Sequence, residues 1–354
     1  MNLNLDNARK VKELVVQHSR AGNLALYAEA QEQGISFSDL LEQLDPTEPG
    51  ASLDAFERQL MLNGILAEGS KGIAMEQFFV GGALILVPEY ILREIQRGYK
   101  MIQDPAELVA TTVFEAGPTV RPIYIKTDKA KESLGRRGSG GGSAYPRVEL
   151  LFRDKEAVVL DRGRQFDFSY RVVRNQKLTE FRVFLWWIGA QMAFDEVDDI
   201  YSILLNGDGA SGAAANVFAG NAGSFVYSDL VHLAMAFTVP ARMSHVLAAQ
   251  SDVEKILNMT EFKDPLVWRN AEPMQRSGDF RSLMPVNSKL VIVPNGTATK
   301  LIGMDAHFAV RESVSQPLMI EAEKVIAQKL ETAVISKESV YTVMVDGAAL
   351  LSDY

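Results

Sequence analysis

The spacing of apolar residues predicts helices in the N-terminal part of the chain. Residues 1–75 have apolar positions at helical intervals, separated by short polar stretches. The apolar run 78–92 follows, and Pro88 is placed to open a further helix that reaches about Tyr99. We therefore expect a segment of short helices over residues 1–75 and a longer helix after Pro88.

In the middle of the chain the period changes to two. Phe166, Phe168 and Tyr170 alternate with polar residues, which predicts a strand with one apolar face. The run GSGGGS within residues 129–150 is as flexible as a natural linker. Residues 121–177 are therefore expected to form a long two-stranded arm. Because an isolated two-stranded ribbon is marginal in water, this arm needs cover from its own chain or from another copy.

Beyond residue 178 the period returns to that of a helix. Apolar residues recur at helical spacing up to Leu204, and they predict a long helix from about Phe184 to Asn206. The opposite face of this helix carries an acidic group formed by Asp195, Glu196, Asp198 and Asp199. Such carboxylates can seat a hard cation. A solvated helix face, or a partner surface for a basic arm, is the favoured interpretation.

The sequence GDGASG, residues 207–212, formally matches the G-x-G-x-x-G pattern of dinucleotide-binding loops. In a nucleotide site this pattern follows a strand and opens a helix, so that the phosphates meet the helix N-terminus. Here it follows a helix, and Gly207 and Gly209 are interpreted as the glycines that end it. A nucleotide-dependent enzyme that uses this loop is the remote alternative, and no cofactor is expected.

The rest of the chain predicts a small α/β domain and a C-terminal region that is harder to assign. Residues 207–305 alternate between helical and strand patterns, and SKLVIVPNGT reads as a buried strand. The local propensity of EAEKVIAQKLETAV, by contrast, favours a helix.

Composition narrows the function classes. The net charge of −9 argues against a general nucleic-acid binder, and the absence of cysteine excludes disulfides and thiolate metal sites. Residues 121–177 hold fourteen Lys and Arg against seven Asp and Glu, a local charge of +7 that leaves −16 for the remainder. This asymmetry favours contacts between complementary surfaces of neighbouring copies.

Motifs for catalysis, metal binding and membrane insertion are missing from the sequence. The four histidines are scattered, and neither a G-x-S-x-G elbow nor a P-loop is present. The densest apolar runs, residues 78–87 and 183–194, are shorter than the roughly 20 residues that cross a bilayer. No catalytic, cofactor-binding or metal-binding residue and no membrane contact are therefore expected.

The order of these elements resembles that of the major capsid proteins of tailed bacteriophages, which have the Hong Kong 97-type fold. The ending ILLNGDGASG, the segment 154–209 and the stretch VIVPNGTATKLIGMDAHFAVRES carry the resemblance. It implies an α+β fold with these parts: N-terminal helical segment, 1–75; N-arm and entry to the P-domain, 76–120; E-loop β-hairpin, 121–177; P-domain spine-helix region, 178–206; α/β A-domain, 207–305; P-domain C-terminal strands, 306–354.

The resemblance implies a structural protein, not an enzyme, that assembles as hexamers and pentamers into the icosahedral head of a phage. The implied partners are other copies of the chain, the portal protein and the enclosed double-stranded DNA, which is held by weak non-specific contact. A scaffolding protein, a maturation protease and a decoration or cement protein are further candidates. The implied location is the virion capsid, assembled in the cytoplasm of the host bacterium. An encapsulin-type nanocompartment shell is the alternative with the same fold.

The resemblance also makes the arm, as an E-loop, the expected contact between subunits. The expected contact residues of the E-loop are Arg136, Arg137, Arg147, Phe166, Phe168 and Tyr170. The acidic group on the long helix is a candidate partner for the arginines. Residues 317–334 are expected to be strand, against their local propensity, because the family places a long sheet there. Cross-linking between Lys155 and a P-domain asparagine is not expected, since the last asparagine, Asn295, precedes the C-terminal strands.

Overall fold

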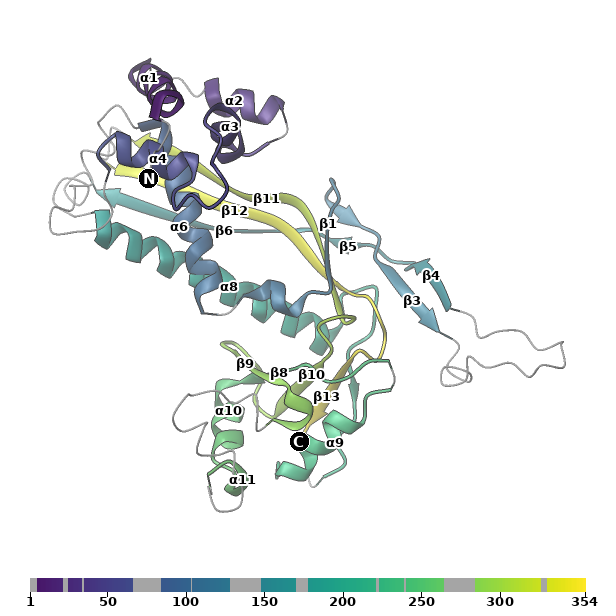
Figure 1. Cartoon of the computed structure of the whole chain (residues 1–354). Helices are drawn as coiled ribbons and strands as arrows, with labels where there is room; N and C mark the ends of the chain where they lie inside the picture. The colour runs from purple at the N-terminus through teal and green to yellow at the C-terminus, as the bar shows by residue number, and fades with distance from the viewer. Residues whose placement is uncertain are drawn as a thin grey trace. The chain divides into compact units, whose positions relative to one another are not determined.

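A computed structural model describes residues 5–21, 25–33, 35–65, 84–102, 104–127, 148–169, 178–220, 223–238, 240–263, 284–325 and 330–354. Helices and strands both contribute to the structure, which confirms the predicted α+β class (Figure 1). The chain divides into two compact units, each made of separate stretches. Unit 1 comprises Met1–Ile102, Gly163–Gln191 and Leu318–Ser336, and unit 2 comprises Gln103–Arg162, Met192–Pro317 and Lys337–Tyr354.

Unit 1 begins with helices, which the sequence predicts for residues 1–75 and after Pro88 but not for residues 84–86. They are α1 (Leu5–Ala21), α2 (Ala25–Glu32), α3 (Phe37–Leu44), α4 (Ala55–Leu62), the 3-10 helix η1 (Leu84–Leu86) and α6 (Val87–Met101). Helices α3 and α4 start at capping boxes, in which the side chains of Ser36 and Asp54 accept hydrogen bonds from backbone N–H groups of the first turn. Pro88 lies in the first turn of α6, as predicted.

Two glycines let α6 approach the first half of helix α8 (Leu178–Asn206) closely. A Cβ atom on Gly98 would lie 2.3 Å from the carbonyl oxygen of Trp186, and one on Gly189 would lie 2.1 Å from that of Ile95. The indole N–H of Trp186 also donates a 2.7 Å hydrogen bond to the buried carboxylate of Glu94. Backbone contact therefore joins the two helices. Helix α8 starts at Leu178, six residues before the predicted start.

A four-stranded sheet has the order β1-β11-β12-β6. Its strands are β1 (Thr111–Phe114), β11 (Val310–Val325), β12 (Leu330–Val343) and β6 (Leu160–Ser169). Strand β1 pairs in parallel with β11, with Thr111 opposite Arg311. All described residues of 317–334 are strand, so the expectation against local helical propensity is confirmed. Pairing within the sheet outweighs the propensity of this segment.

Strand β6 corrects the expected extent of the arm. It joins β12 in the four-stranded sheet instead of serving as the return strand of a hairpin. The two-stranded part of the arm consists of β3 (Ile123–Thr127) and β4 (Val148–Phe152), which we call the ribbon. A second, shorter pair is formed by β2 (Thr119–Val120) and β5 (Ala157–Val158). The period-two pattern of residues 166–170 identified a strand, but a pattern cannot identify the partner of that strand.

Unit 2 contains a five-stranded sheet with the order β7-β13-β10-β8-β9. Its strands are β7 (Ala215–Asn216), β8 (His245–Ala249), β9 (Lys289–Val293), β10 (Lys300–Met304) and β13 (Ala349–Asp353). The remaining helices of this unit are η2 (Pro105–Leu108), α9 (Tyr227–Met235), α10 (Gln250–Leu257), α11 (Thr260–Lys263) and η3 (Pro285–Asn287). The resemblance implies that the last strand belongs to the P-domain, but β13 pairs with β10 in the five-stranded sheet. The apolar side chains of ALLSD are buried in this sheet.

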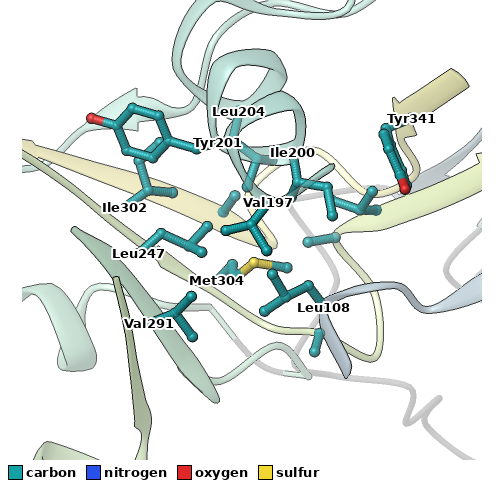
Figure 2. Packing of buried hydrophobic residues seen from close by; sticks show 14 of the residues in the cluster. Leu108, Val197, Ile200, Tyr201, Leu204, Leu247, Val291, Ile302, Met304 and Tyr341 are labelled. Carbon is teal, nitrogen blue, oxygen red and sulfur yellow. The ribbon is translucent and has the colours of Figure 1, made fainter. Parts of the chain in front are cut away.

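The second half of α8 forms a core with this sheet. Figure 2 shows Val197 and Ile200 on the helix close to Leu247 and Met304 on the strands. These four side chains are fully buried. Burial of a Val, Leu, Ile or Met side chain contributes about 1.5–3 kcal/mol, so this core holds the helix firmly on the sheet. The helical spacing of the apolar residues in α8 predicted this buried face.

The order of elements along the chain is the one that the resemblance predicts. Helices come first, and the ribbon, the long helix, the α/β sheet and the long C-terminal strands follow. Apart from the extent of the arm and the pairing of the last strand, the division of the chain into six parts stays a prediction.

Candidate functional site

The described residues form two two-stranded elements, the ribbon and the pair β2-β5. The ribbon carries the larger exposed apolar side chains of the two. The ladder places Ile123 opposite Phe152 and Ile125 opposite Leu150, and directly opposed residues share a face. Val148 lies on the same face because it is two residues from Leu150. We call these five side chains the ribbon face. Val148, Leu150 and Phe152 are 67%, 64% and 62% exposed, so the ribbon face is a candidate contact surface.

Arg153 fixes the base of the ribbon to the C-terminal part of unit 2. Its guanidinium pairs with Asp346 at 2.6 Å and lies 4.5 Å over the ring of Tyr124. The backbone N–H of Ile125 also donates to the carbonyl oxygen of Met344. Sequence reasoning missed this anchor, because Arg153 and Asp346 are 193 residues apart and neither belongs to a motif.

The structure separates the expected E-loop contact residues into two groups. Arg136, Arg137, Arg147 and Tyr170 lie outside the described residues, and Phe168 lies in β6 with its side chain outside the described part. Phe166 is only 6% exposed and packs edge-on against Phe184 within unit 1. Phe166 is therefore a core residue of its own chain and not the expected contact between subunits, because the ring of Phe184 already packs against it.

The acidic group on α8 is engaged mainly within its own chain. Asp199 forms an ion pair with Arg162, and Asp198 accepts hydrogen bonds from the backbone and side chain of Asn295. Burial raises the pKa of Asp198, although the hydrogen bonds from Asn295 oppose the increase. Asp195 is exposed, and its contact with a neighbouring copy stays a prediction.

Glu196 was expected on a solvated helix face as a partner for the basic arm, but it is buried. Its residue is 2% exposed, and its carboxylate lies 3.0 Å from Nζ of Lys337. The hydroxyl of Tyr341 donates a hydrogen bond to the same carboxylate. Lys337 also pairs with Glu312 at 2.7 Å, and Thr112 donates to Glu312 at 3.0 Å. One lysine thus joins two buried carboxylates on α8 and β11.

The pKa of Lys337 is raised by this arrangement. Burial alone would lower it, but the negative charges of Glu196 and Glu312 and their hydrogen bonds outweigh burial. The ammonium group therefore stays charged at neutral pH. The lysine is 141 residues from Glu196, and no sequence motif points to the pair.

The loop after α8 ends the helix as the sequence predicts. Gly207 has a φ of 89° and Gly209 a φ of 80°, both in the left-handed region that favours glycine. The N–H of Gly207 donates to the carbonyl oxygen of Ile203 at 2.8 Å. A Cβ on Gly207 would also lie 2.5 Å from the carbonyl oxygen of Ser211, so this position has no room for a side chain.

Asp208 organises this loop with its carboxylate. The backbone N–H groups of Ala210 and Ser211 donate to one carboxylate oxygen, and that of Val343 donates to the other at 3.0 Å. Burial alone would raise the pKa of Asp208, but these backbone hydrogen bonds outweigh burial. The pKa is therefore below its usual value. Asp208 therefore joins the end of α8 to the end of β12.

We expect Asp208→Asn to destabilise the folded chain by about 1–2 kcal/mol at neutral pH, because hydrogen bonds to a charged acceptor are lost. The folded-state pKa is below the unfolded one, so the stabilisation is present above the unfolded pKa. It disappears as the pH falls through the folded pKa. Urea unfolding at pH 7 and at about pH 3 measures this, since unfolded Asp titrates near 3.9. The difference between variant and parent should shrink in acid, and the exposed Asp161→Asn is the control. A difference that does not change with pH would contradict this role.

The described residues contain no group of three or more potential ligands placed to hold a metal ion. Within the same part of the chain, no helix combines the length and apolar character needed to span a membrane.

Comparison with known proteins gives likenesses in structure only. No protein-family model and no curated protein matches the sequence. A virus-like particle from Pyrococcus furiosus is 11% identical over 75% of this chain and 99% of that chain, with a TM-score of 0.49. The capsid of a native GTA particle is 13% identical over 72% and 91% of the two chains, with a TM-score of 0.48. A chain of Mycobacterium phage Che8 is 13% identical over 71% and 91%, with a TM-score of 0.46.

Proposed function

We propose that this chain is the major capsid protein of a tailed double-stranded DNA bacteriophage. It assembles as hexamers and pentamers into a closed shell that encloses the genome, and it meets the portal protein at one vertex. The observation that carries this proposal is the ribbon face, an apolar surface on an element that is marginal by itself. A second copy of the chain provides the cover that the ribbon lacks.

The element order supports this proposal. The ribbon, the long helix ended by Gly207, the α/β sheet and the long C-terminal strands follow one another as in Hong Kong 97-type capsid proteins. A shell protein also needs no catalytic centre, and its stability is the sum of many modest interfaces. The net charge of −9 suits a container whose inner surface holds DNA without tight binding.

Light scattering after size-exclusion chromatography tests the proposal on the purified full chain. We expect capsomers at low protein concentration and closed particles under assembly conditions, with negative-stain microscopy to show their shape. A chain that is well folded by circular dichroism and stays monomeric at every concentration and salt tested would overturn it. DNA enclosed in particles isolated from cells would identify a viral shell, and an enzyme inside them would identify a nanocompartment instead.

A further inference from the structure

A cleft of about 590 Å³ lies at the base of the ribbon, within unit 2. It is lined by residues of β3, by the end of β4 and the three residues after it, and by Ala210 and Asp346. Three cationic side chains line the cleft, Lys126, Arg153 and Lys155. The lining residues include two carboxylates, Asp154 and Asp346, so the cleft has an excess of positive charge.

Arg153 is held in place, whereas the two lysines are exposed. The Arg153 side chain is 11% exposed, because one nitrogen of its guanidinium pairs with Asp346 and its plane lies over Tyr124. Lys126 and Lys155 form no ion pair with any described residue. Two exposed ammonium groups thus share a cleft with one guanidinium that is held by Asp346 and Tyr124. Such a set matches a small ligand with several oxygen atoms and negative charge.

Ala210 is the residue of the glycine-rich loop that lines the cleft, and its N–H is not aimed at a ligand. The N–H groups of Ala210 and Ser211 already donate to the carboxylate of Asp208. The loop therefore differs from a phosphate-binding loop, in which the backbone N–H groups point at the ligand. Recognition of an anion here would depend on the side chains of the ribbon base.

We propose that this cleft binds a small oxyanion of the inorganic phosphate class through Lys126, Arg153 and Lys155. The ligand balances the excess positive charge, and it accepts charge-assisted hydrogen bonds from all three side chains. Asp154 opposes binding because its negative charge lines the same cleft. The inference concerns the folded chain alone, so it does not depend on shell assembly.

Calorimetric titration with inorganic phosphate, at constant ionic strength, tests the site in the unassembled full chain. We expect saturable binding that weakens about tenfold or more in Lys126→Met with Lys155→Met, because two charged donors are lost. Lys10→Met with Lys100→Met removes the same charge at exposed positions outside the cleft, and it should bind like the parent. Asp154→Asn should bind more tightly than the parent. Arg153 is left unchanged, since its loss would also free Asp346.

The same oxyanion chemistry could come from a carboxylate on a second copy of the chain. Phosphate would then compete with that carboxylate, and it would raise the protein concentration at which scattering by particles begins. If phosphate binds the unassembled chain and leaves assembly unchanged, a free anion is the natural ligand. Absence of saturable binding by the parent, or an equal loss in the two double-lysine variants, would overturn the site. Failure of assembly alone would leave it standing.

Discussion

Replacing Leu150 and Phe152 with Asp is expected to abolish particle assembly while the chain still folds. Both side chains are more than 60% exposed on the ribbon face, so the single chain loses little packing. In the assembled state the same positions would lose about 1.5–3 kcal/mol each of apolar burial and would add buried charge. The protein concentration needed for assembly should therefore rise by about a hundredfold or more.

Light scattering over a concentration series measures this shift, and circular dichroism with thermal melting verifies the fold. The matched control is Met101→Asp with Met235→Asp, because these methionines are 66% and 65% exposed and lie outside the ribbon. The control adds the same charge and should assemble at about the parental concentration. Assembly of the ribbon variant at the parental concentration would show that the ribbon face is not the contact surface.

Lys337→Met should destabilise the folded chain by about 3–5 kcal/mol, the usual loss when one partner of a buried ion pair is removed. The lysine side chain is 14% exposed and lies between Glu196 and Glu312, at 3.0 and 2.7 Å. Without the ammonium group, two buried carboxylates face each other with no cation between them. The raised pKa of Lys337 means that its stabilisation is complete below the unfolded-state pKa. It is lost only as the pH rises through the folded-state pKa, in strong alkali.

Urea unfolding at neutral pH measures the loss. Lys300→Met is the matched control, because its pair with Asp353 is 3.7 Å long and about one third exposed. Exposed pairs of this kind contribute about 0–1 kcal/mol. Adding Glu312→Gln to Lys337→Met should restore part of the stability, since it removes one of the uncompensated charges. If Lys337→Met unfolds like the control, or Glu312→Gln gives no rescue, the buried network is not what holds β12 to α8.

Much of the fold follows from local pattern. The helical period revealed α8 with its buried face, and the glycines at 207 and 209 marked its end because left-handed backbone favours glycine. The strands over 317–334 did not follow from pattern, since the local propensity there is helical and only sheet pairing makes strands of it. That expectation came from the resemblance alone.

The candidate site was less accessible to sequence reasoning. The ribbon face became visible only when the register paired Ile125 with Leu150, because VELLF has no simple alternation. Glu196 was expected on a solvated helix face, but Lys337, far away in sequence, buries and neutralises it. A period of apolar residues can identify the buried side of a helix. It cannot show that a distant cation will make an acidic position part of the interior.

The reciprocal close approach of α6 and α8 limits how this sequence can change over time. Gly98 meets the backbone of Trp186, and Gly189 meets the backbone of Ile95, so any side chain at either position collides with main-chain atoms. Main-chain atoms cannot change rotamer to make room, so a side chain at either position would force one of the helices to shift. We therefore expect both positions to remain glycine in related sequences, even where surface charges and other apolar side chains differ. Glycine at both positions is thus the feature of these two helices that we expect distant relatives to share.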